Sequence, residues 1–224
     1  MKVEKIVKNL IKNDIAYIKS DPMMWMTLCI PPLTIIGYYV LTGYFDFIVP
    51  YKAPLTYLFI NIMPMTTGGV LGLRILEEKD QQLLRYYAIT PLTLRGYFIY
   101  RSIMSFVISF IGTTIICIGL MGTVPLLFVV YEALLGVLCT FAMGTIAKNK
   151  IQGIVLFKPL NSLILLPCIR LLGDNEYDNL LKIMPWDYSY KILVENSWSM
   201  LQYILYLFSI ILLGGYLAYS IRVE

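Results

Sequence analysis

Residues 102–147, SIMSFVISFIGTTIICIGLMGTVPLLFVVYEALLGVLCTFAMGTIA, decide the fold because this long stretch carries one charged side chain, Glu132. About 20 apolar residues in a helix are enough to cross the hydrocarbon core of a bilayer. The stretch is about twice that length, so it predicts two membrane-spanning helices that fold back on each other. The segment GLMGTVP (119–125) lies between them and supplies residues that favour a turn.

The composition of the whole chain also indicates a protein that has lipid as its solvent. Of the 224 residues, 58% are hydrophobic and 14% are charged, and the mean hydropathy is +0.73. A soluble domain carries about 25% charged residues. The net charge is only +4 and the basic residues are scattered, which argues against a nucleic acid partner. The four cysteines lack a C-x-x-C spacing and the chain has no histidine, so we expect no metal site.

Six runs with few or no charges are each long enough to cross a bilayer. We therefore expect an all-α, polytopic membrane protein in which residues 22–224 form one domain of six transmembrane helices. In the second run Gly68 and Gly72 form a small-x-x-x-small face suited to close helix packing. The fifth run is the least regular, because Lys158, Pro159 and Arg170 interrupt it. The expected spans are 22–45, 53–74, 102–119, 125–147, 151–172 and 198–221.

Residues 1–21 predict a separate amphipathic helix in front of the first span. Its apolar side chains recur at helical spacing and its lysines fall mostly between them. A basic amphipathic helix of this kind lies on the cytoplasmic face of a membrane, where anionic lipid attracts lysine. A solvated basic tail is the alternative. Asp21 followed by Pro22 is a typical start signal for the first span.

The distribution of Lys and Arg predicts the orientation in the cell membrane. The N-terminal segment and every second loop after it hold 14 of the 18 basic residues, and the other loops hold 4. By the positive-inside rule both termini are therefore expected in the cytoplasm. Residues 173–197 then lie outside. Their apolar patches, 180–186 and 192–194, are too short to span, and they either dip into the membrane or form interfacial helices.

The second cytoplasmic loop, LEEKDQQLLRYYAITPLTLRGYFIYR (76–101), carries the most specific pattern in the chain. Its apolar side chains Leu76, Leu83, Leu84 and Tyr87 share one helical face, which predicts an amphipathic helix over 77–87 at the membrane surface. Thr90 and Pro91 then break this helix and restart the chain as the third span. An ordinary charged linker is the alternative. The polar residues that point elsewhere on the helix are Glu77, Glu78, Gln81, Gln82 and Arg85.

At these residues the chain resembles the ABC-2 type family of transport permeases, in which an acidic helix after the second span precedes a Thr-Pro-Leu-Thr step. Here that step is Thr90 to Thr93. The wider string GLRILEEKDQQLLRYYAITPLTLRGYFIYR, together with Asp21-Pro22 and Pro31-Pro32, is most similar to the drug-export permeases within that family, typified by fluoroquinolone exporters. The resemblance extends through the six-span layout to nearly the whole chain.

The resemblance implies that an ABC ATPase subunit docks on this loop, called the coupling helix, and that two permease subunits, identical or different, form a dimer. It also implies partial-depth helices between the fifth and sixth spans. Within the coupling helix, Glu78, Gln82 and Arg85 are expected to point outward, while Leu83 and Tyr87 anchor it to the bundle. The residues expected to bind the ATPase are Glu77, Glu78, Asp80, Gln82, Arg85, Tyr86, Thr90 and Pro91.

ATP itself is expected to belong to the partner. The sequence has no G-x-x-x-x-G-K-[ST] phosphate loop. We therefore expect no cofactor in this chain, and ATP and Mg²⁺ in the ATPase subunit.

Glu132 is the one acid deep in a predicted span, and two interpretations of it stay open. It could contact a cationic group of a substrate or pair with Arg170 of the fifth span, as buried ionisable residues in membranes usually have a partner. Alternatively it is a protonated carboxyl, or one hydrogen-bonded to a neighbouring Tyr or Thr.

The function that fits these patterns best is that of a permease subunit of an ATP-driven exporter, which moves a drug, peptide or lipid-like molecule across the cell membrane. Such a chain contacts membrane lipid and is not itself an enzyme. Two alternatives from other classes are a membrane-embedded enzyme, which needs a cluster of reactive side chains facing a cavity, and a non-transport sensor or assembly factor.

Overall fold

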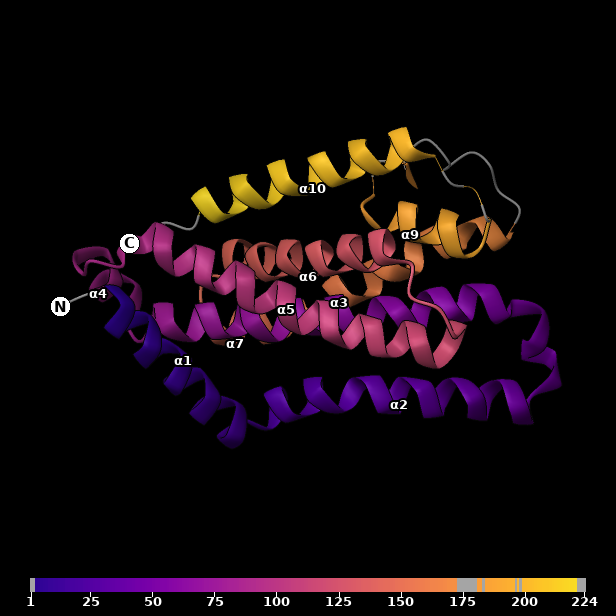
Figure 1. Cartoon of the computed structure of the whole chain (residues 1–224), viewed down its shortest axis with the longest axis horizontal. Helices are drawn as coiled ribbons and strands as arrows, with labels where there is room; N and C mark the ends of the chain where they lie inside the picture. The colour runs from indigo at the N-terminus through magenta and orange to yellow at the C-terminus, as the bar shows by residue number, and fades with distance from the viewer. Residues whose placement is uncertain (1–2, 173–180, 183, 196, 198, 221–224) are drawn as a thin grey trace.

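The structure is a computed structural model of the chain, and it describes residues 3–172, 181–182, 184–195, 197 and 199–220. These residues form an elongated bundle of helices (Figure 1). The expected all-α fold is confirmed for this part of the chain. The elements are α1 (Val3–Ser20), α2 (Pro22–Tyr44), the 3₁₀ helix η1 (Asp46–Tyr51), α3 (Lys52–Asp80), α4 (Leu83–Ile89), α5 (Thr93–Met121), α6 (Leu126–Ile146), α7 (Lys150–Ser162), the 3₁₀ helix η2 (Leu163–Leu172), α9 (Trp186–Leu193) and α10 (Met200–Ser220).

Five helical segments in the described residues are long and apolar enough to cross a membrane, so this is a multi-pass membrane protein. They are Pro22–Tyr44, Asp46–Asp80, Thr93–Met121, Leu126–Ile146 and Lys150–Leu171. The first and fourth agree with the expected spans 22–45 and 125–147 to within one residue at each end. The sixth expected span, 198–221, contains α10. The described apolar part of α10, Gln202–Leu217, is shorter than the five segments above, so the sixth span stays a prediction.

Two of the helices are longer than their expected spans. Both α3 and α5 have 29 residues, about 44 Å at 1.5 Å per residue, against a hydrocarbon core of about 30 Å. Their extra turns lie at the end of the bundle that carries α4 (Figure 1). The segments 74–80 and 95–101, which contain charged residues, are therefore helical continuations of the two spans, and they make α3 and α5 longer than the bilayer core is thick.

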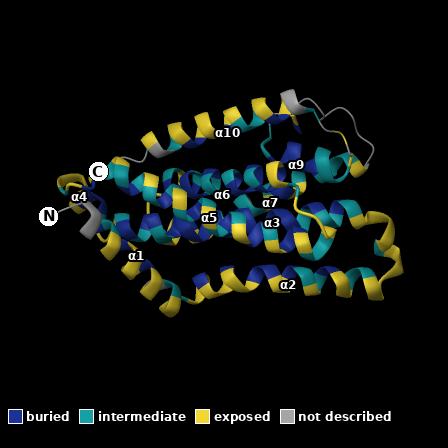
Figure 2. Cartoon of the chain, viewed as in Figure 1, coloured by how far each residue is buried: buried dark blue, intermediate teal, exposed yellow. Residues whose placement is uncertain are grey.

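The centre of the bundle is formed by α3 and α6, which are largely buried, whereas α2 and α10 expose their outer faces (Figure 2). Glycines bring α3 and α6 close together, as the small-x-x-x-small face predicts. A Cβ atom on Gly68 would lie 2.4 Å from the Cβ of Cys139, and one on Gly72 would lie 2.5 Å from the Cβ of Met143. Only glycine allows this approach.

A row of buried polar side chains on α5 faces α6. Ser105, Ser109 and Thr113 follow one another at intervals of four residues, and all three are fully buried. Ser105 Oγ lies 2.8 Å from Thr140 Oγ1, and a Cβ atom on Gly136 would lie 2.2 Å from Ser109 Oγ. These two contacts fix the register of the antiparallel helices α5 and α6.

Candidate functional site

The segment expected to be a single coupling helix over 77–87 is divided in two. Helix α3 continues through Asp80, the backbone of Gln82 adopts the left-handed conformation with a φ of 58°, and α4 begins at Leu83. The expectation of one helix is therefore wrong at Gln82. The physical reason is that a left-handed residue cannot continue a right-handed helix. It turns α4 away from α3, so that α4 packs back on the bundle.

The anchoring face of α4 is the one the sequence predicts. Leu84 and Tyr87 are buried and Leu83 packs against them in an apolar cluster with Ile6 of α1 and Ile75 of α3. The ring of Tyr87 stacks on that of Tyr97 of α5, with 4.9 Å between the centroids. Burial raises the pKa of the Tyr87 phenol to about 12, so this side chain is neutral at physiological pH.

Next to α4, charged and tyrosine side chains from three helices form a buried group, here called the Arg101 cluster. Its members are Asp14 of α1, Glu78 of α3, and Tyr97, Tyr100 and Arg101 of α5. The side chain of Arg101 is fully buried, and Asp14 and Glu78 are 3% and 2% exposed. Arg101 Nη2 lies 2.5 Å from Glu78 Oε1, and Arg101 Nη1 lies 3.1 Å from Asp14 Oδ2. One guanidinium therefore joins three helices through two carboxylates.

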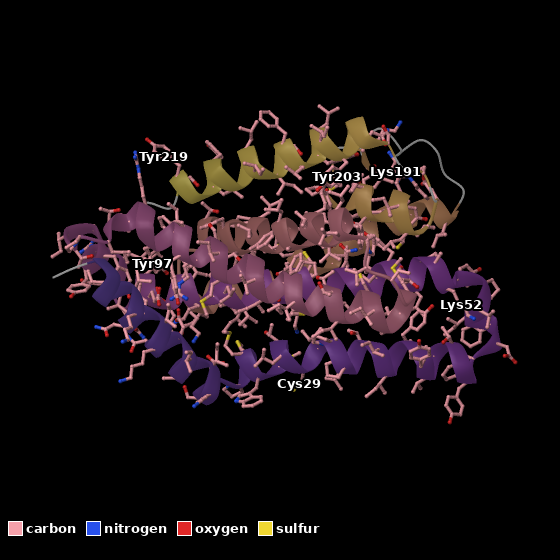
Figure 3. The ribbon with its side chains drawn as sticks, in the orientation of Figure 1. Cys29, Lys52, Tyr97, Lys191, Tyr203 and Tyr219 are labelled. Atoms are coloured by element: carbon pink, nitrogen blue, oxygen red, sulfur yellow. The ribbon has the colours of Figure 1, made fainter. Side chains whose placement is uncertain are left out.

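The tyrosines of α5 complete the hydrogen bonds of the Arg101 cluster. The hydroxyl of Tyr97 donates to Glu78 Oε2 and accepts from Arg101 Nε, while that of Tyr100 donates to Asp14 Oδ2 at 2.5 Å. The guanidinium also lies over the rings of Tyr97 and Tyr100, 5.4 and 5.5 Å from their centroids. Tyr97 marks the position of the cluster in Figure 3, near the end of the bundle that carries α4.

A rim of ion pairs surrounds the cluster and ties in α7. Arg74 lies 3.3 Å from both Glu77 and Glu78 along α3. Lys150, at the start of α7, pairs with Glu77 through its Nζ at 3.1 Å and donates its backbone N–H to Asp80 Oδ2 at 3.0 Å. Glu77, Glu78 and Asp80 thus mainly make contacts between helices.

The residues expected to bind the ATPase therefore divide into two groups. The expectation that Glu78 points outward is wrong: it is one turn after Arg74 and faces α5, where Arg101 and Tyr97 hold it. Gln82 and Arg85 are exposed, as expected. Binding to a partner stays a prediction for the exposed and partly exposed residues Glu77, Asp80, Gln82, Arg85, Tyr86, Thr90 and Pro91.

Asp14 and Arg101 are not among the residues expected from the sequence, although the sequence contained a signal for Asp14. Asp14 follows Ile6 and Leu10 at four-residue intervals, and all three are buried. An acid within the apolar stripe of an amphipathic helix requires a buried partner. Arg101 is one turn after Tyr97 on α5, at the boundary of the apolar run. A charged residue at this position is typical of the end of any membrane span.

A second ionic cluster, here called the Asp187 cluster, lies at the opposite end of the bundle, where Figure 3 labels Lys191. Asp187 of α9 is fully buried and pairs with Arg170 of η2 and with Lys191, the latter at 2.9 Å. Tyr206 of α10 donates its hydroxyl to Asp187 Oδ2 at 3.0 Å. Arg170 also lies 3.7 Å from Glu195.

Glu132 and Arg170 have different partners, so the expected ion pair between them is wrong. Arg170 pairs with Asp187 and Glu195, whereas the carboxylate of Glu132 accepts a hydrogen bond from the hydroxyl of Ser189. Glu132 is thus hydrogen-bonded, but its donor is Ser189 of α9 and not the expected Tyr or Thr, and its contact with a substrate stays a prediction. Asp187, Ser189 and Glu195, which are these partners, lie in the segment after the fifth span. That segment has no distinctive sequence pattern.

Residues 14–221 match the family model described as fluoroquinolones export permease protein Rv2686c-like. The chain belongs to this family. Two relatives from Mycobacterium tuberculosis carry the name fluoroquinolones export permease protein, MT2760 of strain CDC 1551 / Oshkosh and Rv2686c of strain ATCC 25618 / H37Rv. Each is 24% identical over 191 residues, which is 78% of this chain and 76% of the relative.

Membership identifies the chain as a membrane export permease, a transport protein rather than an enzyme. The match begins at Asp14 and includes both ionic clusters. The similarity to drug-export permeases expected from residues 76–101 is thus confirmed.

Proposed function

We propose that this chain is the permease subunit of an ATP-binding-cassette exporter, with six spans, both termini in the cytoplasm, and a second permease subunit beside it. ATP and Mg²⁺ are held by a separate ATPase subunit. The substrate is an amphipathic or apolar molecule of the drug, peptide or lipid-like kind. The two relatives are named for fluoroquinolones, which makes planar aromatic drugs the first substrates to test.

The observation that carries the proposal is the two-sided character of α4. Its inner face, Leu84 and Tyr87, packs on the Arg101 cluster, while Tyr86 and Ile89 on its outer face are 51% and 84% exposed. An exposed aromatic and an exposed isoleucine beside Arg85 form the kind of apolar patch with a polar rim that marks a protein interface. We infer that the ATPase docks here and along the α3–α4 turn.

The Arg101 cluster supplies a path by which movement of α4 reaches the membrane helices. A displaced α4 moves Tyr87, whose ring stacks on Tyr97, and Tyr97 is bonded to both Glu78 and Arg101. Buried ion pairs resist separation, because a buried charge without a partner is strongly destabilising. We infer that α1, α3 and α5 therefore move together when the ATPase closes, and differential contacts in the two states couple the two sites.

Two further features support the proposed topology. The 14 to 4 distribution of basic residues favours cytoplasmic termini, and α10 extends from the α9 end of the bundle back to the α4 end (Figure 1). Helix α9 has eight residues and packs among α3, η2 and α10 with Trp186–Tyr190 buried, which supports a partial-depth helix between the fifth and sixth spans. Of the patch 180–186, residues 180 and 183 lie outside the described residues.

The test is disruption of the outer face of α4 without disturbance of its inner face. We expect Tyr86→Ala with Ile89→Asp to leave the permease in the membrane at normal levels and to reduce co-purification of the ATPase about tenfold or more, since truncation of an interface anchor typically costs 2 kcal/mol or more. Export of a fluoroquinolone from cells should fall in parallel.

The matched control is Phe47→Asp in η1, which also places an acid at an exposed apolar position, with the side chain 72% exposed, but at the other end of the bundle. It should retain ATPase association. Normal association and export in the Tyr86/Ile89 variant would remove the proposed docking face.

A further inference from the structure

An apolar cavity of about 240 Å³ lies within the single chain, between α3, α6, α7, η2, α9 and α10. Among the described residues that line it there is no Asp, Glu, Lys or Arg. Its walls carry sulfur and aromatic groups, which include Met65, Cys139, Met143, Phe157 and Trp186. The cavity is separate from both ionic clusters, whose charged residues do not line it.

The packing of α7 on α3 shapes one side of the cavity. Gly69 of α3 allows the ring of Phe157 to lie directly on the backbone, because a Cβ atom at Gly69 would be 1.9 Å from that ring. Ile146 of α6 and Leu213 of α10 also line the cavity and are 53% and 46% exposed. Exposed apolar residues at the edge of the cavity place its opening on the lipid-facing surface of the bundle.

The chemistry of the walls limits what can occupy the cavity. An ionised group would enter without a partner, which is strongly unfavourable. An apolar cavity of about 150 Å³ in another protein stays dry and binds benzene, so a cavity of about 240 Å³ has room for a larger ring system. Sulfur atoms make favourable contacts with aromatic rings, and so do the rings of Phe and Trp.

We propose that this cavity is a binding site for compact, uncharged, bicyclic aromatic molecules that enter from the membrane. A rigid ring system suits it better than a lipid acyl chain, since a flexible chain loses more conformational freedom on binding. The site needs neither the ATPase nor a second permease, so binding to the purified chain tests it independently of the proposed export function.

The experiment measures equilibrium binding of tritiated naphthalene to the purified protein in detergent, with 2-naphthoate as the anionic counterpart of the same ring system. We expect saturable binding of naphthalene, and binding of 2-naphthoate weaker by about tenfold or more because of its charge. Ala142 lines the cavity, so Ala142→Phe should fill it and abolish binding. Leu33→Phe, which adds a ring on the exposed face of α2, should leave binding unchanged.

A second variant tests the site even if Ala142→Phe fails to fold. Leu213→Ala enlarges the cavity and should allow the three-ring hydrocarbon phenanthrene to bind at least as tightly as naphthalene binds to the unmodified chain. Equal binding of naphthalene and 2-naphthoate, unchanged binding in folded Ala142→Phe, or failure of Leu213→Ala to admit phenanthrene would each overturn the proposal. Loss of naphthalene binding when dioleoyl phosphatidylcholine is added would also overturn it, by assigning the cavity to lipid chains.

Discussion

Arg101 is fully buried and pairs with two buried carboxylates from two other helices. Asp14 is 87 residues away in sequence and Glu78 is 23 residues away. Burial of three charges is unfavourable unless their geometry and additional hydrogen bonds are good, and the hydroxyls of Tyr97 and Tyr100 supply those bonds. The cluster therefore specifies how α1, α3 and α5 fit together.

Removal of Arg101 alone should be strongly destabilising. We expect Arg101→Met to lower the free energy of unfolding by about 3–5 kcal/mol, because it leaves Asp14 buried without its cation and Glu78 with Arg74 alone. Measured as thermal unfolding in detergent, the triple variant Arg101→Met, Asp14→Asn, Glu78→Gln should recover much of that loss. Arg95→Met, at an exposed position of α5 two turns earlier, is the control. A loss in the triple variant as large as in the single one would contradict the assignment of the ion pairs.

At the scale of residues, the sequence predicts whether a side chain is exposed better than it predicts which residue a buried side chain pairs with. Gln82 and Arg85 are exposed as their polarity suggests, and Tyr87 is buried as its place in the apolar stripe suggests. Glu78 and Asp14 could not be assigned in the same way. The apolar stripe of α1 indicates that Asp14 is buried but not which residue pairs with it. Whether Glu78 faces solvent or an arginine depends on how α3 packs on α5, and the periodicity of α3 alone does not determine that.

At the scale of elements, the long apolar helices are predictable and the short turns between them are not. Helices α2 and α6 end where the apolar runs end. The break between α3 and α4 has no such signal, because the sequence Lys79-Asp80-Gln81-Gln82 lacks glycine and proline and non-glycine residues rarely adopt a positive φ. The anchoring of Leu84 and Tyr87 on the bundle selects this break.

The interface between α5 and α6 yields the second stability prediction. A Cβ atom on Gly136 would lie 2.2 Å from Ser109 Oγ, so we expect Gly136→Ala to lower the free energy of unfolding by about 1–3 kcal/mol through overpacking. Ser109→Gly in the same chain should relieve the clash and restore part of the loss. Gly43→Ala in α2 meets nothing within 4 Å and should be neutral or slightly stabilising, since alanine favours helix. Unfolding in detergent measures all three, and equal effects at Gly136 and Gly43 would contradict the close packing of α5 on α6.

At the scale of the whole molecule, the two ionic clusters lie at opposite ends of the bundle. Figure 3 labels Tyr97 near one end and Lys191 near the other, and the outer faces of α2 and α10 between them are apolar and exposed. A protein whose lateral surface is apolar and whose ends are charged lies with its long axis across the bilayer. The proposed orientation makes the α4 end the cytoplasmic one, because basic residues favour that side.

This arrangement predicts the side of the membrane on which each loop lies, and Ser220 is the most informative position. Helix α10 begins near α9 and ends at Ser220, at the same end of the bundle as α4 (Figure 1). In a background from which Cys29, Cys117, Cys139 and Cys168 have been replaced, we expect cysteines introduced at Lys148 and Ser220 to react with a membrane-impermeant maleimide only in inside-out vesicles. A cysteine at Asp46, the first residue of η1, should react only in right-side-out vesicles, and it serves as the matched control for orientation. Labelling of position 220 from the same side as position 46 would mean that α10 does not cross the membrane, so that the chain would have an odd number of spans and the two termini would lie on opposite sides.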